Sequence, residues 1–208
     1  MRQIAWATVM VTALLASGCS TTANTTTAVP GATVPSASSP ISSEALPFTE
    51  TSGLLYATID GADMSMDVFA PTGEGPWPVV VAFHGRSSAG KDFVETVALA
   101  EEAARRGMVV FTPTWLVGNP FPASSGSFER WDDTVSCAVA FAQQKATEFG
   151  GDPNRTVIEG FSGGAGAALL FASRAPRVDP VPGCASDALP GPVAGFVLGP
   201  VVAAVHDA

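Results

Sequence analysis

Gly160-Phe161-Ser162-Gly163-Gly164 is the pentapeptide from which the architecture of this chain is inferred. It follows the β-branched run 155–159 and precedes the small-residue run 165–173, which predicts a sharp turn from a strand into a helix. A serine on such a turn has a strained backbone, and flanking glycines remove the Cβ atoms that would crowd it. The pattern is typical of a nucleophile elbow with Ser162 as the nucleophile. The alternative is an ordinary strand–turn–helix joint in which Ser162 caps the helix.

Upstream of this turn, two strands over 54–59 and 64–69 flank Asp60-Gly61, which is a hairpin signal. In the second strand apolar residues alternate with Ser65 and Asp67, so we expect the face that carries these two polar residues to meet solvent. Buried strands are expected over 78–83, 108–112, 155–159 and 192–198, and helices over 93–104, 135–149 and 165–173. A hairpin followed by strand–helix alternation predicts an α/β protein with a doubly wound, mostly parallel sheet.

Ligands bind beyond the carboxyl ends of the strands in such a sheet. Three segments converge there: residues 84–89, a long loop over 113–130, and the turn at Ser162. The aromatic residues around the long loop either line an apolar pocket or cover the end of the sheet; they are Trp115, Phe121, Phe128 and Trp131. Asp132-Asp133 is expected to cap the helix that follows this loop.

Three stretches together resemble the α/β-hydrolase superfamily, in particular its secreted esterases and dienelactone-hydrolase-like members. They are residues 79–85 (VVVAFHG), 151–155 (GDPNR) and 160–164 (GFSGG), and the resemblance covers about residues 50–200. It implies an α/β-hydrolase fold and hydrolysis of small-molecule carboxylic esters, without a cofactor or metal. It further implies that the backbone N–H groups of Gly163 and Arg86 form an oxyanion hole, and that His84 braces its loop.

A serine nucleophile needs a histidine base and an orienting acid, which in this superfamily follow it in the order Ser, Asp or Glu, His. Apart from His84 the chain has only His206, next to Asp207 and two residues from the C-terminus. We expect these two to form an exposed tail, and the base and acid to lie in a further C-terminal region. The sheet is accordingly expected to lack the last two strands of the fold.

The last predicted strand, 192–198, would then be an exposed apolar edge. Two explanations stay open: the sequence is a fragment, or two copies pair these edges in a homodimer. The oligomeric state stays unknown. A second function also stays open, namely a catalytically inactive envelope lipoprotein that uses the scaffold to bind a ligand or partner.

The first 18 residues predict a bacterial lipoprotein signal peptide. Arg2 precedes an apolar stretch over 4–15 that is too short to span a bilayer. It ends at Ala16-Ser17-Gly18-Cys19, which resembles a lipobox with alanine in the usual place of leucine. We therefore expect lipidation of Cys19 and attachment to the outer face of the cytoplasmic membrane in the bacterial cell envelope, with plain secretion as the alternative.

The remaining composition fits this location. Residues 19–45 are rich in Ser, Thr, Ala and Pro and predict a disordered stalk, which leaves 46–208 as one partial hydrolase domain. The formal net charge of −9 argues against nucleic acid as a partner. Cys137 and Cys184 are an even pair in an oxidising compartment and predict a disulfide, with two separate buried thiols as the alternative.

Overall fold

The structure of the protein is a computed structural model that describes residues 45–85, 90–115, 127–174 and 176–199. Side chains are described in these ranges except for residues 127–130 and Leu198. Several predictions lie outside the described residues. They concern the signal peptide 1–18 with Cys19, the stalk up to residue 44, Arg86, Phe121, the side chain of Phe128, and His206 with Asp207.

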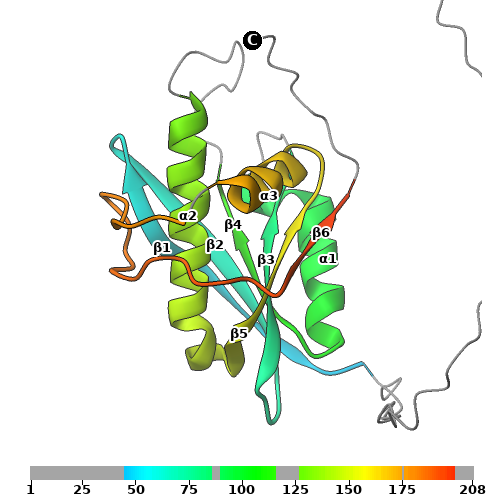
Figure 1. Cartoon of the computed structure of the whole chain (residues 1–208). Coiled ribbons are helices and arrows are strands. Elements are labelled where there is room, and N and C mark those ends of the chain that lie inside the picture. Colours follow the sequence, from blue (N-terminus) through cyan, green and yellow to red (C-terminus); the bar gives the residue numbers. More distant parts are fainter. Residues whose placement is uncertain (1–44, 86–89, 116–126, 175, 200–208) are drawn as a thin grey trace, which may run out of the picture. The chain divides into compact units, whose positions relative to one another are not determined.

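The described residues form a six-stranded sheet in the order β1-β2-β4-β3-β5-β6 (Figure 1). The strands are β1 (Phe48–Ile59), β2 (Ala62–Pro71), β3 (Trp77–Phe83), β4 (Val109–Pro113), β5 (Gly151–Gly160) and β6 (Gly195–Leu198). β1 and β2 are antiparallel, as are β2 and β4, whereas β4, β3, β5 and β6 run parallel. The prediction of a mostly parallel sheet with an antiparallel edge is confirmed.

The hairpin forms where the sequence predicted it. Asp60 and Gly61 both have positive φ, at 52° and 77°, which is what a two-residue turn between twisted strands requires. β1 begins at Phe48, six residues before the predicted start, because the polar residues 49–51 pair with β2 along the edge of the sheet. An edge strand tolerates such polar side chains.

Three helices cover the two faces of the sheet: α1 (Val94–Arg105), α2 (Ser127–Lys145) and α3 (Gly163–Ser173) (Figure 1). Two short 3₁₀ turns, η1 (Gly90–Asp92) and η2 (Ala146–Phe149), join them to neighbouring elements. In β3, Val79, Val81 and Phe83 belong to the large core beneath α2 and α3, whereas Val80 and Ala82 face the smaller core beneath α1. β3 is therefore buried on both faces, as its continuous apolar run predicted.

Two expectations for the region before Val135 were wrong. α2 begins at Ser127, inside the segment expected to be loop, and Trp131 packs its ring against Trp115 at 5.8 Å. Asp132 and Asp133 therefore lie inside the helix and do not cap it. Asp132 forms ion pairs with Arg174 (3.1 Å) and Arg177 (2.8 Å), and Asp133 pairs with Arg177 (2.9 Å). These carboxylates link α2 to the chain that leaves α3.

A disulfide joins Cys137 on α2 to Cys184. The chain around Cys184 also meets the free edge of β1. The Ala185 N–H donates to the Tyr56 carbonyl, and the Thr58 N–H donates to the Gly183 carbonyl, both at 2.8 Å. The disulfide thus holds this connection against α2 while its backbone covers part of the first sheet edge, which would otherwise offer unpaired groups.

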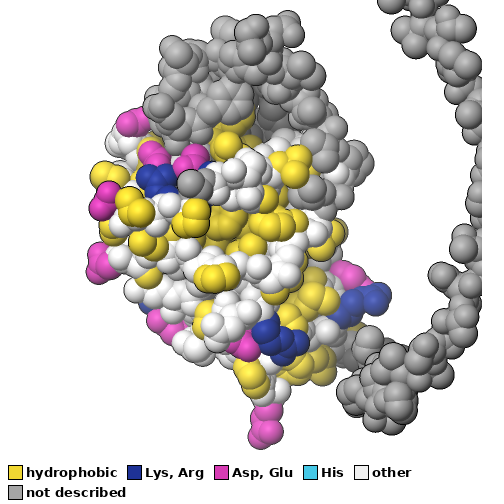
Figure 2. All heavy atoms as spheres, viewed as in Figure 1, with side chains coloured by type: hydrophobic (Ala, Val, Ile, Leu, Met, Phe, Trp, Pro, Cys, Tyr) yellow, Lys and Arg dark blue, Asp and Glu magenta, His cyan; other side chains and the backbone are white. Residues whose placement is uncertain are grey.

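Charged side chains lie mainly at the margin of the face formed by α2 and α3, and hydrophobic side chains occupy its middle (Figure 2). In the described part of the chain no helix is long and apolar enough to cross a membrane.

Candidate active site

The carboxyl ends of β3 and β5 lie side by side, because Phe83 at the end of β3 pairs with Gly160 at the end of β5. The two strands lead into His84-Gly85 and Phe161-Ser162, respectively. The Phe161 N–H donates to the Phe83 carbonyl at 3.3 Å, which joins the two exits beyond the last strand pair. This edge is where a doubly wound sheet binds ligands.

Ser162 is in a strained conformation, with φ 52° and ψ −110°. Only two non-glycine residues of the described chain have positive φ, and the other is Asp60 in the hairpin turn. A Cβ atom on Gly164 would overlap the Phe83 carbonyl, and one on Gly160 would overlap the Gly164 carbonyl. The turn is thus so tight that both flanking positions exclude any side chain, as the pentapeptide predicted.

The alternative role for Ser162, capping of α3, does not occur. The Ser162 side chain makes no capping hydrogen bond, and its hydroxyl has no hydrogen-bond partner among the described residues. The N–H groups of Gly164, Ala165 and Gly166 are used within the turn, where they donate to the carbonyls of Phe161 and Ser162. Within the described chain the Gly163 N–H has no acceptor, so it is available beside the Ser162 hydroxyl.

His84 lies fully buried directly after β3. Its ring donates from Nδ1 to the Gly85 carbonyl at 2.6 Å, and the Trp115 indole donates to the His84 carbonyl at 2.9 Å. Burial lowers the pKa of His84, which favours the neutral ring. These contacts fit a brace for the loop rather than a base for Ser162.

Trp115 belongs to the core and does not line a pocket. It is almost fully buried, and its ring meets Phe83 edge-on at 6.2 Å. Of the two roles left open for the aromatic residues, Trp115 therefore covers the end of the sheet.

Glu159 is a buried acid that the sequence analysis did not single out. It lies three residues before Ser162 on the α1 face of β5, in register with Ala82 of β3 and Val197 of β6. Its exposed fraction is 8%, and burial raises its pKa from 4.5 to about 7. The only sequence signal was a single acid in an otherwise apolar run, and exposed strand edges often carry such acids.

Neither a histidine nor a carboxylate bonds to Ser162 within the described chain. The same residues contain no cluster of His, Cys, Asp or Glu that could hold a metal ion. The described part of the site therefore supplies a strained serine and a free N–H donor at the edge of the sheet.

No protein-family model and no curated protein sequence matches the chain. Its structure is similar to that of a candidate carboxylesterase from Lactobacillus plantarum, with 11% identity, a TM-score of 0.53, and coverage of 75% of this chain and 61% of the other. A candidate dienelactone hydrolase from Klebsiella pneumoniae has 21% identity and a TM-score of 0.47, covering 62% of this chain and 56% of the other.

The unliganded esterase 2 of Thermogutta terrifontis has 22% identity and a TM-score of 0.46, covering 60% of this chain and 44% of the other. The chain thus spans less than two thirds of the length of each of these three proteins. The mixed sheet, the tight turn at Ser162 and the likeness to the Lactobacillus protein define the class: this chain has the α/β-hydrolase fold.

Proposed function

We propose that the protein is a serine hydrolase of small-molecule carboxylic esters, with Ser162 as its nucleophile. The observation that carries this proposal is the backbone of Ser162 at φ 52°, held between two glycines that exclude a Cβ atom. A strained conformation costs stability and is kept where it serves a site. The similar structure from Lactobacillus plantarum is that of a candidate carboxylesterase, which agrees with the proposal.

In this mechanism the Ser162 Oγ forms a bond to the ester carbonyl carbon, and the carbonyl π electrons move to its oxygen. The N–H groups of Gly163 and Arg86 stabilise the oxyanion; loss of one such donor typically costs about 3 kcal/mol in the transition state. The tetrahedral intermediate then breaks down to release the alcohol and leaves the acyl group on Ser162. Water hydrolyses this acyl-serine. The serine proton goes to a histidine, which passes it to the departing alkoxide; in this proposal the histidine and its acid lie C-terminal to the described residues.

The proposal is tested with the full-length protein, a fluorophosphonate probe and a short-chain aryl ester such as p-nitrophenyl acetate. We expect one labelled serine and turnover, and we expect Ser162→Ala to abolish labelling and lower kcat at least 1,000-fold. Ser173→Ala is the matched control, since Ser173 ends α3 and its hydroxyl donates to the Leu170 carbonyl of the same helix at 3.2 Å. Turnover that survives Ser162→Ala contradicts the proposal.

One observation favours the alternative function, a non-catalytic envelope protein that binds a ligand or partner. The Ser162 hydroxyl has no partner in the described chain, and a serine without a base is a poor nucleophile. A full-length protein that is folded, unlabelled and inactive on aryl esters would support this alternative.

We also propose that Cys19 carries a lipid and anchors the protein to the cell envelope. Its place after a short apolar stretch supports this proposal. Cys19→Ser should move the protein from the membrane fraction to the soluble fraction; an unchanged distribution would contradict the anchor.

A further inference from the structure

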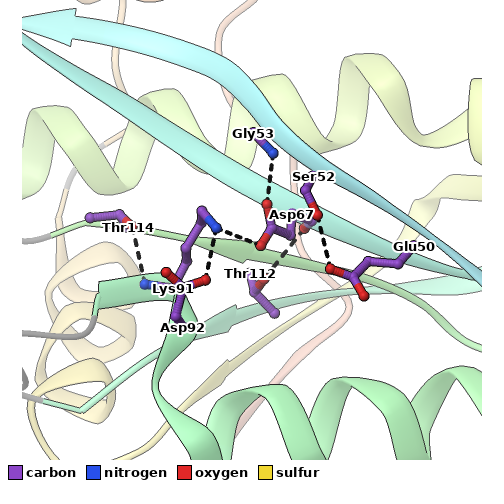
Figure 3. A network of polar contacts seen from close by, with 8 residues as sticks. All are labelled: Glu50, Ser52, Gly53, Asp67, Lys91, Asp92, Thr112 and Thr114. Atoms are coloured by element: carbon purple, nitrogen blue, oxygen red, sulfur yellow. Dashed lines mark hydrogen bonds and ion pairs between the residues drawn. The ribbon is translucent and has the colours of Figure 1, made fainter.

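An ion pair between the buried Asp67 and the partly buried Lys91 lies where β2, β4 and η1 meet (Figure 3). Asp67 was expected on the wet face of β2, but its side chain is only 7% exposed. Its Oδ1 accepts from the Gly53 N–H and its Oδ2 from the Lys91 Nζ, both at 2.7 Å. The expectation was wrong because Lys91, which lies 24 residues further along the chain, folds back to cover this position.

A second contact of Lys91, made by its backbone, connects η1 with the residue that follows β4. The Lys91 N–H donates to the Thr114 Oγ1 at 3.0 Å, and the Tyr56 hydroxyl donates to the Thr114 carbonyl at 2.6 Å. Gly90 has φ +58°, and a Cβ atom there would lie 2.9 Å from the Thr114 Oγ1. Both the side chain and the backbone of this short turn are therefore held in place.

A ring contact connects the residue after η1 with the tight turn at Ser162. The Phe93 N–H donates to the Gly90 carbonyl at 3.1 Å, and the Phe93 ring stacks on Phe161 with 6.3 Å between centroids. Phe161 immediately precedes Ser162. A continuous series of contacts thus runs from Asp67 through Lys91 and Phe93 to the residue beside the strained serine.

Stability alone does not explain why charged residues occupy these two positions. An apolar residue in place of the buried Asp67 would often stabilise the fold as well as this ion pair does, because the carboxylate must leave water. The second partner of Lys91, Asp92 at 2.8 Å, has a side chain that is 71% exposed and adds little. The Asp67–Lys91 ion pair and the Lys91 N–H bond to Thr114 together connect η1 with β2 and β4.

We propose that Asp67 and Lys91 are positioning residues for the site at Ser162: their ion pair holds η1 so that Phe93 supports the elbow. This inference rests on the proposed function for its effect on catalysis. Its effect on the order of the elbow does not depend on that function, so the two can fail separately.

The test uses Lys91→Met and Asp67→Asn in the full-length protein, with Lys91→Arg as the conservative variant. Lys145→Met is the matched control, because it removes a surface ion pair with Glu148 (2.7 Å) at the C-terminal end of α2. We expect Lys91→Met and Asp67→Asn to lower kcat by about 10- to 100-fold, with KM nearly unchanged, since a small misplacement of a catalytic group has effects of this size. Lys91→Arg should largely restore kcat, and Lys145→Met should match the wild type.

Amide hydrogen exchange is the second readout. Both charge-removing variants should exchange faster over residues 157–166, with no change over the hairpin turn 58–63. If a single variant fails to fold, the double variant Asp67→Asn/Lys91→Met, which leaves no unpaired charge, takes its place and should show the same local effect.

Folded variants with wild-type kcat and wild-type exchange over 157–166 would overturn the inference. So would faster exchange across the whole sheet, because that indicates general destabilisation. If the wild-type protein neither turns over esters nor reacts with the probe, the proposed function fails, and the exchange over 157–166 alone decides whether the pair orders the elbow.

Discussion

At the scale of single residues, Glu159 lies in a place that disfavours its charge. Its carboxyl group is buried on the α1 face of β5, and burial raises its pKa to about 7. The folded protein therefore binds a proton at Glu159 more tightly than the unfolded chain does. Its unfavourable contribution is absent below about pH 4.5 and develops as the pH rises through 7.

We expect Glu159→Gln to stabilise the protein by about 3 kcal/mol at pH 8 and to have little effect at pH 4.5, because the shift of the Glu159 pKa from 4.5 to about 7 corresponds to about 1.4 kcal/mol per unit. Urea unfolding of both proteins at the two pH values measures this difference. Glu74→Gln is the control, since Glu74 is exposed. Equal stability of wild type and Glu159→Gln at pH 8 would show that Glu159 is charged at no cost.

At the scale of elements, the connection between α3 and β6 is long but well anchored. Cys184 joins it to α2, and the backbone of 183–185 pairs with Tyr56 and Thr58 on the first edge of the sheet. Gly191 and the Pro192 carbonyl also bond to the side chain of Gln143 on α2, at 2.8 and 3.1 Å. The disulfide closes a loop of 47 residues, and in the chain-entropy model this loop length corresponds to about 4 kcal/mol.

We expect Cys137→Ala/Cys184→Ala to lower the free energy of unfolding by about 2–4 kcal/mol. Faster amide exchange should appear first at Tyr56 and Thr58, where the connection covers β1. Wild type treated with a thiol reductant is the matched comparison and should show the same loss. An unchanged unfolding midpoint in both samples would mean that the other contacts of this connection hold it in place without the disulfide.

At the scale of the whole molecule, the two edges of the described sheet differ. The β1 edge is partly covered by residues 183–185, whereas β6 pairs with β5 alone among the described strands. Two large apolar side chains on β6 are exposed, Phe196 by 38% and Val197 by 56%. An exposed apolar edge strand tends to pair with another chain.

We expect the 208-residue chain to self-associate as its concentration rises, and Val197→Lys to reduce this association, since a lysine on an edge strand opposes pairing. Sedimentation velocity of the two proteins over a concentration series measures the effect. Val178→Lys serves as the control, because Val178 is 85% exposed and lies outside every strand. Association that is equal in all three proteins would exclude the β6 edge as the contact.

The predictions from sequence succeeded where the cause lies within a few residues. Asp60-Gly61 permits the positive φ of a tight hairpin turn, and the glycines around Ser162 permit the tight turn after β5. The unbroken apolar run of β3 required cover on both faces, and the structure provides it. The roles predicted for three residues stay predictions, because these residues lie outside the described ranges: Arg86 in the oxyanion hole, Cys19 as the lipidated residue and His206 in an exposed tail.

The errors arose where a distant segment changes the surroundings of a residue. Asp67 alternates with apolar residues like a solvent-facing position, but Lys91 covers it. Asp132 and Asp133 resemble a helix cap, but α2 begins earlier, at Ser127, and both carboxylates pair with arginines that follow α3. The pattern of neighbouring residues in the sequence contains no information about partners from distant segments.

The amino-acid sequence by itself determined the order and type of the strands and helices, the hairpin and the backbone strain at Ser162, because propensity, periodicity and glycine sterics act over short distances. Only the tertiary structure decided the strand order β1-β2-β4-β3-β5-β6, the burial of Asp67 and Glu159, and the contacts from Lys91 to Phe161. These depend on which segments meet in space, and the burial of a charge, together with its partner, is fixed only when they meet.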